Sequence, residues 1–203
     1  AQVTAYVQSL ADKYDTVGIE RHFTSIAGNE VDVEGGTYGW TIDQEAETEK
    51  LINQIKKGRQ VKREPEYAHY AKSRKKNDIG DTYVEVDLGS QHMWFYKDGE
   101  TIVSTPVVTG NTSLGRGTPT GVYYILYKTT DYTLTGEGYA SPVDYWLPFT
   151  HSGVGIHDSS WRSSYGGSIY TYDGSHGCVN TPYDAVRTIY NNIESTYPVV
   201  VHW

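Results

Sequence analysis

Hydrophobic positions repeat with two different periods along this chain, and the change falls near residue 80. In the first fourteen residues they recur at helical spacing, which predicts an amphipathic helix. Asp43 is a suitable N-cap for a second helix, which the acidic residues after it and the lysines before Gly58 also favour. The apolar face of this second helix is expected to consist of Ala46, Leu51, Ile52 and Ile55.

Short strands are predicted in both parts of the chain. Runs at 17–19 and 31–33 indicate strands in the first part, so residues 1–80 are interpreted as a small α+β domain. Beyond residue 80 the apolar positions alternate, and Lys97-Asp98-Gly99-Glu100 is a strong hairpin signal. The strands predicted there cover 83–88, 93–96, 101–109, 122–127, 145–149, 153–157 and 199–201.

A single late helix is expected from Ala185 to about Ile193, because Pro182 occupies a position that suits a first helical turn. Many short strands with one late helix predict a mostly β domain over residues 81–203, either a sandwich or a partly closed barrel. The charged run at 72–78 is typical of a solvated linker, so the boundary between the two domains is placed near residue 80.

The charge of the chain is unevenly distributed. Residues 1–80 hold 12 Lys and Arg against 13 Asp and Glu, while residues 81–203 hold 5 against 12, which together give the net charge of −8. So acidic a second half argues against nucleic-acid binding, which needs clustered Lys and Arg. No run of apolar residues is long enough to span a membrane, and the chain opens with Ala1. We expect a longer natural protein with a leader or anchor before this point.

Cys178 is the only cysteine, so it cannot form an internal disulfide. A lone cysteine can simply pack as a small hydrophobic residue. Gly177 and His176 precede it, however, and His157 lies upstream in a Gly-Ile-His-Asp segment. Polar, glycine-rich surroundings with a nearby base are what a reactive thiol requires. We therefore interpret Cys178 as a nucleophile.

The segment Ser-His-Gly-Cys-Val-Asn at 175–180, with Gly-Ile-His at 155–157, resembles the signature of the L,D-transpeptidase catalytic domain (YkuD fold). Segments at 107–110, 118–121, 145–149 and 198–201 follow in the order of that family, so the resemblance covers about residues 82–203. The segment 38–43 resembles a peptidoglycan-binding domain that often precedes the catalytic one in Gram-positive bacteria. A core Trp followed by a helix cap would explain the same segment.

The resemblance implies roles for several residues. Cys178 would be the nucleophile and His157 the base, as a histidine–thiolate pair at neutral pH. His176 would be a supporting polar contact, or alternatively the base. Asp158 could orient His157 through its backbone carbonyl or its carboxylate, or be an exposed loop acid. Ser175 could hydrogen-bond a histidine or the substrate, or only shape the turn.

The remaining candidate residues concern the substrate. The backbone N–H groups of Gly177 and Cys178 are expected to bind the oxyanion, although the glycine could equally serve only a tight turn. Trp161 is a candidate wall of a peptide groove. Asn180 is a candidate substrate contact, but it replaces an Arg of many family members, and Asp158 likewise replaces a Gly. A zinc site is disfavoured because paired ligand spacings are missing, and no cofactor is expected.

The function that the resemblance implies is 3→3 cross-linking of peptidoglycan stems through a Cys acyl-enzyme, with release of D-Ala. Hydrolysis of the same acyl-enzyme, an L,D-carboxypeptidase activity, is the first alternative, and a non-catalytic cell-wall binding module is the second. The expected partners are the donor and acceptor stem peptides, with carbapenem β-lactams as inhibitors. We further expect a monomer on the extracellular face of a bacterial membrane, with roles in cell shape and β-lactam resistance.

Overall fold

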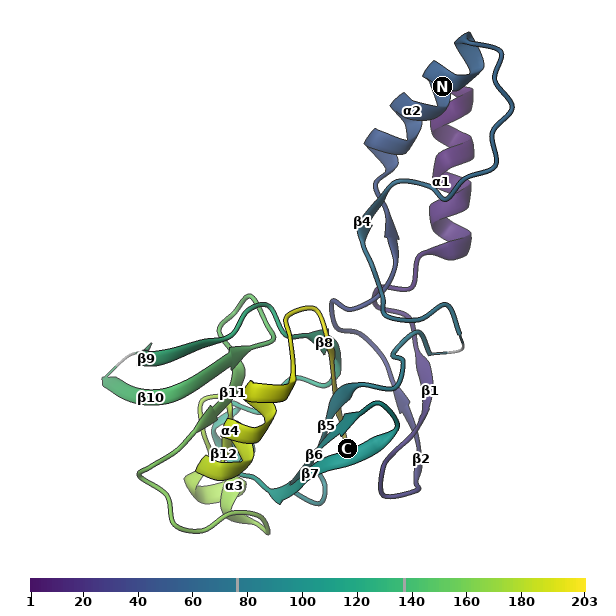
Figure 1. Cartoon of the computed structure of the whole chain (residues 1–203). Coiled ribbons are helices and arrows are strands. Elements are labelled where there is room, and N and C mark those ends of the chain that lie inside the picture. Colours follow the sequence, from purple (N-terminus) through teal and green to yellow (C-terminus); the bar gives the residue numbers. More distant parts are fainter. Residues whose placement is uncertain (76, 137) are drawn as a thin grey trace.

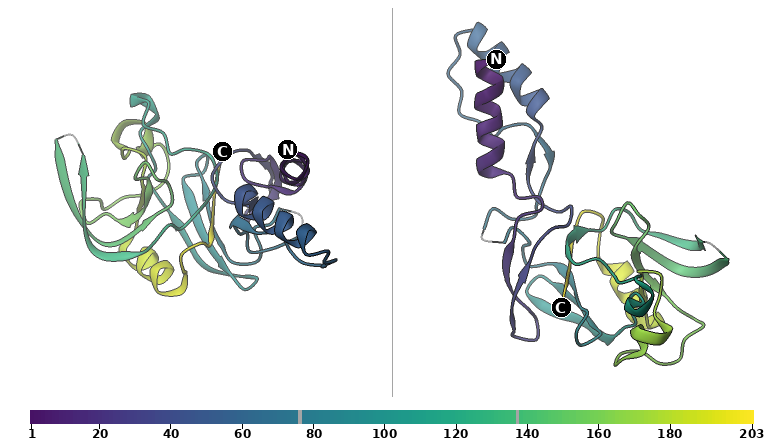
Figure 2. Two further views of the ribbon diagram at one scale, coloured as in Figure 1. Left: turned by 90° about the horizontal axis from the view of Figure 1, so that it is seen from above. Right: turned by 180° about the vertical axis from the view of Figure 1, so that it is seen from behind.

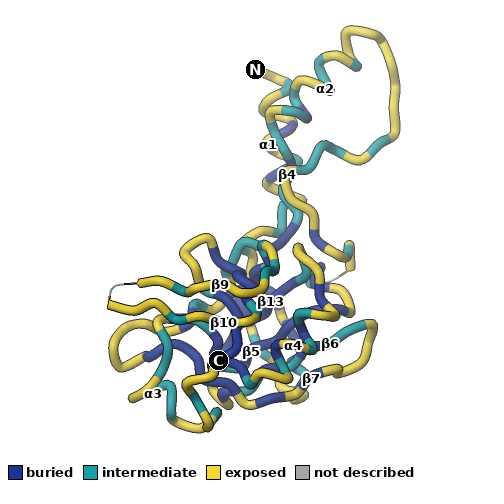
Figure 3. Tube along the Cα trace, turned by 60° about the vertical axis from the view of Figure 1, so that its left-hand side comes forward, coloured by how far each residue is buried: buried dark blue, intermediate teal, exposed yellow. Residues whose placement is uncertain are grey.

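The structure of the protein is a computed structural model that describes residues 1–75, 77–136 and 138–203. It has two parts, which Figure 1 shows as a narrow arm and a larger body. The arm carries the N-terminus, and the body carries most of the strands and the C-terminus (Figures 1 and 2). Buried positions are concentrated in the body (Figure 3). Within the described ranges, no helix combines the length and the apolar character needed to cross a membrane.

The arm confirms both helices predicted for the first part of the chain. The Asp43 side chain accepts a hydrogen bond from the Ala46 N–H at 3.0 Å, so it caps the second helix as expected. Val7 and Ala11 of the first helix pack against Ile42 in a small core. The elements of the arm are α1 (Gln2–Tyr14), β3 (Thr41–Ile42), α2 (Gln44–Lys56) and β4 (Tyr67–His69).

The predicted apolar face of α2 is wrong at its C-terminal end. Ile55 is 59% exposed, whereas Glu47 is buried. Arg63, far along the chain, donates from Nη1 and Nη2 to the two carboxylate oxygens of Glu47 at 2.7 and 2.9 Å. A buried carboxylate needs such a partner, and helical periodicity cannot reveal one that lies in a later loop.

A hairpin of β1 (Arg21–Thr24) and β2 (Glu30–Val33) connects the arm to the body. The strand predicted at 17–19 is wrong, because the chain turns at Gly18, where φ is +77°, and pairing starts only at Arg21. Arg21 is buried and donates to the Asp78 carboxylate at 2.8 Å. Asp78 is therefore buried rather than part of a solvated linker, while Lys76 of the same charged run lies outside the described residues.

The central sheet of the body has five strands in the order β7-β6-β5-β13-β8. Asp98 and Gly99 form the predicted hairpin turn between β6 and β7, with φ values of +53° and +89°. The strands are β5 (Tyr83–Asp87), β6 (His92–Lys97), β7 (Glu100–Pro106), β8 (Gly121–Tyr124) and β13 (Pro198–His202).

A second sheet has four strands in the order β12-β11-β10-β9. Strand β9 was not predicted, and β10 starts at Tyr139 instead of Tyr145, because this hairpin is exposed on both faces and lacks apolar alternation. The strands are β9 (Thr129–Gly136), β10 (Tyr139–Pro148), β11 (Gly155–Asp158) and β12 (Val179–Thr181). The helical elements of the body are η1 (Thr112–Leu114), α3 (Ile169–Asp173) and α4 (Tyr183–Asn192).

The two sheets and α4 enclose one core, and the N-terminal hairpin covers the other face of the central sheet. Val199 and Val201 of β13 join the core with α4, while Val200 packs with Phe23 and Tyr38 on the opposite face. Burial on both faces explains why the centre of β13 consists of three valines. The mostly β, open two-sheet body with the late helix α4 confirms the predicted fold class, although the short helix α3 was not predicted. Within the described residues neither sheet closes into a barrel.

Candidate active site

A cavity of about 250 Å³ opens between the β9–β10 hairpin, the loop after β11 and the loop before β12. It brings together six of the candidate residues predicted from the sequence, while Asp158 and Gly177 are not part of its lining. The six are His157, Trp161, Ser175, His176, Cys178 and Asn180. Strands β11 and β12 run parallel with His157 opposite Asn180, which places both histidine and cysteine segments at the same edge of the cavity.

Cys178 lies directly before β12 and is half-buried, with its Sγ 3.6 Å from the Gly153 carbonyl oxygen. Burial raises the pKa of its thiol to about 11, because a thiolate loses its hydration there. A hydrogen bond from the Gly155 backbone offsets only part of this rise in the pKa. The free protein therefore holds Cys178 as a thiol at neutral pH.

His157 is buried at the centre of β11. Its Nδ1 donates to the backbone carbonyl of Asp158 at 2.7 Å, and the Asp158 carboxylate instead accepts the Tyr145 N–H at 2.8 Å. Of the alternatives left open by the sequence, the structure selects the backbone carbonyl. Burial lowers the pKa of His157, and its contacts with Asp158 offset this in part.

The directions of these two pKa shifts disagree with the predicted histidine–thiolate ion pair. Burial disfavours the charged form of both groups, and both shifts therefore favour a neutral thiol on Cys178 and a neutral imidazole on His157. A sequence motif specifies the pair of residue types but not how far they are desolvated, and the ion pair stays a prediction.

His176 is exposed and has different neighbours from His157. Its ring stacks on Tyr139 with centroids 4.8 Å apart, and Arg116 Nη1 lies 2.7 Å from its Nε2. Because a guanidinium can only donate, Nε2 is an acceptor and the proton of the neutral ring is on Nδ1. The Nε2 atom of His176 is thus occupied by Arg116.

Ser175 shapes the loop that carries Cys178. Its Oγ donates to the Cys178 carbonyl oxygen at 2.6 Å and accepts the Gly177 N–H at 3.0 Å. Thr118 donates to the Gly177 carbonyl oxygen at 2.6 Å and holds the loop from outside. The Gly177 N–H is therefore already used within the loop, so the oxyanion prediction rests on the N–H of Cys178.

Gly177 has a φ of +125°, a conformation that favours glycine. Trp161 is 51% exposed, and its ring centroid lies 5.8 Å from that of His157, so it can wall the cavity as predicted. Asn180 is buried, and its backbone exchanges hydrogen bonds with Val108 at 2.9 and 3.0 Å.

Two arginines at the cavity were missed by the sequence analysis. Arg162 lines the cavity and donates to the carboxylate and carbonyl of Asp173 at 2.9 and 2.7 Å, and Arg116 contacts His176. Residues 81–203 contain only five Lys and Arg. Because basic residues are so rare there, each of them could have been considered as a candidate site residue.

A group of three potential metal ligands occurs elsewhere in the part of the chain that the structure describes. Glu20, His22 and Asp32 lie close together on and beside the β1–β2 hairpin, where all three are exposed. They are far from Cys178 in the sequence and take no part in its cavity lining.

Comparisons with known proteins agree with this site. Residues 81–201 match the family model of the L,D-transpeptidase catalytic domain, and residues 1–62 match a family described as "Putative peptidoglycan binding domain". No curated protein matches the sequence significantly.

Among solved structures, the chain is similar to a mutant form of the Enterococcus faecium L,D-transpeptidase, with a TM-score of 0.84 and 42% identity over 99% of this chain and 81% of that one. It is also similar to the catalytic domain of the E. faecium enzyme acylated by ertapenem, with a TM-score of 0.55 and 46% identity over 60% of this chain and 97% of that one. A Mycobacterium tuberculosis L,D-transpeptidase shares the fold, with a TM-score of 0.54 and 21% identity over 61% and 58% of the two chains.

Proposed function

This chain belongs to the L,D-transpeptidase (YkuD) family, and from that premise we propose that it forms 3→3 cross-links in peptidoglycan through an acyl-enzyme on Cys178. The observation that carries the proposal is the pairing of Cys178 and His157 in one cavity, with His157 held in a single tautomer by the Asp158 carbonyl. That bond leaves Nε2 of His157 as the free proton acceptor.

Acylation starts from the neutral pair. Sγ of Cys178 attacks the carbonyl carbon of the third residue of a tetrapeptide stem as Nε2 of His157 takes the thiol proton. The Cys178 N–H donates to the developing oxyanion. The C–N bond to the terminal D-Ala then breaks, its nitrogen receives the proton from His157, and a thioester to Cys178 remains.

The second half of the reaction reverses these roles. The side-chain amine on the third residue of a neighbouring stem attacks the thioester carbon, and His157 takes a proton from that amine. The new amide bond forms as the C–S bond breaks, and the proton returns to sulfur. Attack by the amine in place of water is what distinguishes this reaction from that of an L,D-carboxypeptidase.

The proposal extends to inhibitors, partners and location. A relative of this chain has been solved in an ertapenem-acylated form, which supports carbapenems as reagents for Cys178. The N-terminal match supports binding of peptidoglycan by the arm. We also propose that the protein acts as a monomer at the cell wall, outside the bacterial membrane, where it contributes to cell shape and β-lactam resistance.

Incubation of the protein with a tetrapeptide-containing muropeptide tests the reaction. Mass spectrometry should detect a cross-linked dimer together with free D-Ala, and a Cys178→Ala variant should give neither. Tripeptide without dimer would instead identify an L,D-carboxypeptidase. Correctly folded protein that forms no adduct with ertapenem and no product would identify a binding module.

A further inference from the structure

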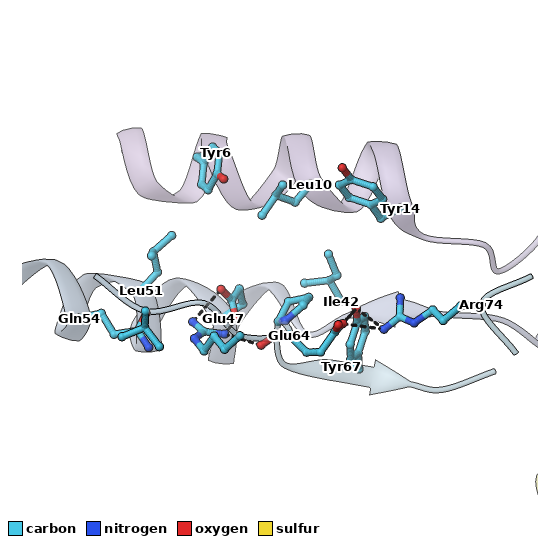
Figure 4. A pocket seen from close by; sticks show the side chains of 13 residues that line it. Tyr6, Leu10, Tyr14, Ile42, Glu47, Leu51, Gln54, Glu64, Tyr67 and Arg74 are labelled. Carbon is cyan, nitrogen blue, oxygen red and sulfur yellow. Dashed lines mark hydrogen bonds and ion pairs between the residues drawn. The ribbon is translucent and has the colours of Figure 1, made fainter. Parts of the chain in front are cut away.

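A second cavity, of about 360 Å³, lies in the arm between α1 and α2, and it shares no lining residue with the cavity at Cys178. Figure 4 shows Leu10 of α1 reaching toward the opposite wall, from which Ile42 and Leu51 point back. Tyr6 and Tyr14 of α1 also line the cavity. The three α1 residues are spaced by four, so they share one face of the helix. The cavity is the open side of the small core of the arm.

Three tyrosines contribute to the walls of this cavity, together with aliphatic and charged side chains. Tyr6 and Tyr14 are 55% and 52% exposed, which is a large exposure for rings that border a cavity. On the opposite side, the ring of Tyr67 packs edge-on against Trp40 with centroids 5.0 Å apart, and the Arg74 guanidinium lies 4.9 Å from the Tyr67 ring. These contacts fix the position of Tyr67 before any ligand binds.

The charged groups around the cavity compensate one another. Arg63 pairs with the buried Glu47 through two hydrogen bonds, and Arg74 Nη2 donates to Glu64 at 2.8 Å. Two cations and two anions therefore line the cavity in matched pairs. Neither a free carboxylate nor a free amine would find an unpaired charge here, so the lining favours an uncharged ligand.

We propose that this cavity binds an uncharged pyranose ring of a peptidoglycan glycan strand, an inference that rests on the proposed function. A pyranose presents an apolar C–H face that can stack on Tyr6 or Tyr14, and its hydroxyl and acetamide groups can use the amide of Gln54 at the cavity edge. Stem peptides carry carboxylates and amines, for which this cavity offers no unpaired charge. The arm extends away from the body, so it can hold glycan while Cys178 reacts with a stem (Figure 1).

A chitin-type hexasaccharide of β-1,4-linked N-acetylglucosamine, which lacks stem peptides, is the probe for this site. Its binding to the full chain is measured by isothermal titration calorimetry for wild type, Tyr6→Ala, Tyr14→Ala and Tyr14→Phe. Loss of one stacking ring should raise Kd about tenfold, while Tyr14→Phe keeps the ring and should stay within about twofold. Tyr127→Ala is the matched control, because Tyr127 is 48% exposed and does not line this cavity.

Circular dichroism shows whether each variant keeps its helices, which is expected because Ala is a stronger helix former than Tyr. Absence of hexasaccharide binding to wild type, or equal binding by the folded Tyr6→Ala and Tyr14→Ala variants, would overturn the inference. Turnover of a soluble tetrapeptide should be unchanged in all four variants. Because that turnover reports on Cys178 and the hexasaccharide reports on the arm, failure of the proposed function and failure of this inference are distinguishable.

Discussion

The Nδ1 atom of His157 lies 2.7 Å from the carbonyl oxygen of Asp158, its own neighbour along β11. A carbonyl oxygen can only accept, so this single contact fixes both the tautomer and the ring orientation of His157. The orienting group is therefore part of the backbone, and the Asp158 side chain is free to bind the β10 backbone at Tyr145. Substitutions of the His157 and Asp158 side chains should consequently have very different effects on the rate of acylation.

Substitution of His157 by Ala should lower the rate of acylation by ertapenem about 10²–10⁴-fold, the usual contribution of a positioned base. Asp158→Asn should keep the rate within about threefold, because the Asn amide oxygen still accepts the Tyr145 N–H and the backbone carbonyl is unchanged. Stopped-flow acylation kinetics of both variants measure this. A large loss in Asp158→Asn would show that the carboxylate, not the carbonyl, supports His157.

His176→Ala provides the comparison between the two histidines. Arg116 already donates to Nε2 of His176, so this ring is not free to accept the thiol proton at that atom. The variant should therefore lose less acylation rate than His157→Ala, measured under the same conditions. Equal losses would return His176 to consideration as the base.

The rate at which iodoacetamide alkylates Cys178 should be low at pH 7 and should increase continuously toward pH 11. Only the thiolate reacts, and burial raises the pKa of this thiol to about 11. The pH dependence of the alkylation rate, followed by mass spectrometry of the intact protein, measures the thiolate fraction directly. A plateau already reached near pH 7 would establish the ion pair that the sequence alone suggested.

The pH profile of ertapenem acylation should differ from that of alkylation. Acylation needs neutral His157 to accept the proton, and burial lowers the pKa of His157 below its ordinary value of 6.5. The acylation rate should therefore increase with pH in the acidic range, and the midpoint of this increase should lie below pH 6.5. The rate should no longer change with pH near neutrality. A midpoint above 6.5 would contradict a buried, neutral base.

The parts of the site that the sequence predicted correctly are those fixed by local order. Gly177 and Cys178 are adjacent, so their shared loop could be read from the sequence. Strand β12 was not among the predicted strands, and its pairing with β11 is a finding of the structure. The positions of Arg116 and Arg162 could not be predicted. Arg116 contacts His176, which is distant in the sequence, and the contact of Arg162 with Asp173 depends on the course of an irregular loop.

The fold shows the same division between local and long-range information. Asp43 was identified as a cap because its partner lies three residues away. Burial of Glu47 and Asp78 could not be inferred, since each depends on an arginine far along the chain, Arg63 and Arg21. Periodicity assigns charged residues to solvent unless such a partner is known.

Ser175→Ala should slow ertapenem acylation about tenfold and lower the melting temperature by several degrees. The substitution removes the hydrogen bonds of Oγ to the Cys178 carbonyl and the Gly177 N–H, each worth about 1 kcal/mol, from a loop that positions the nucleophile. Ser175→Thr keeps the hydroxyl and should recover most of the rate. A wild-type rate in Ser175→Ala would mean that Gly177 and Thr118 alone hold this loop.

The hydrogen bond between His202 Nε2 and the fully buried Glu85, at 3.2 Å, should make folding stability depend on pH. Burial alone would lower the pKa of His202, but its bonds to Glu85 and to the Trp203 carbonyl outweigh this and raise the pKa. A group with a raised folded-state pKa stabilises the protein fully below its unfolded pKa and loses that contribution as pH rises through the folded value. Stability from this pair should therefore fall as pH increases above about 6.5.

The variant His202→Gln isolates this contribution, because Gln can donate to Glu85 but does not titrate. Urea denaturation of both proteins between pH 5 and 9 gives the difference in unfolding free energy. The wild-type advantage should be largest at the acidic end, on the order of 2 kcal/mol for a hydrogen bond between charged groups, and shrink with rising pH. The contribution of His157 to the unfolding free energy has the opposite pH dependence, because burial lowers its pKa. Both proteins contain His157, so this contribution cancels in the difference. Since Glu85 also accepts the Ile26 N–H of the β1–β2 hairpin, a difference independent of pH would show that Glu85 holds this hairpin without a charged His202.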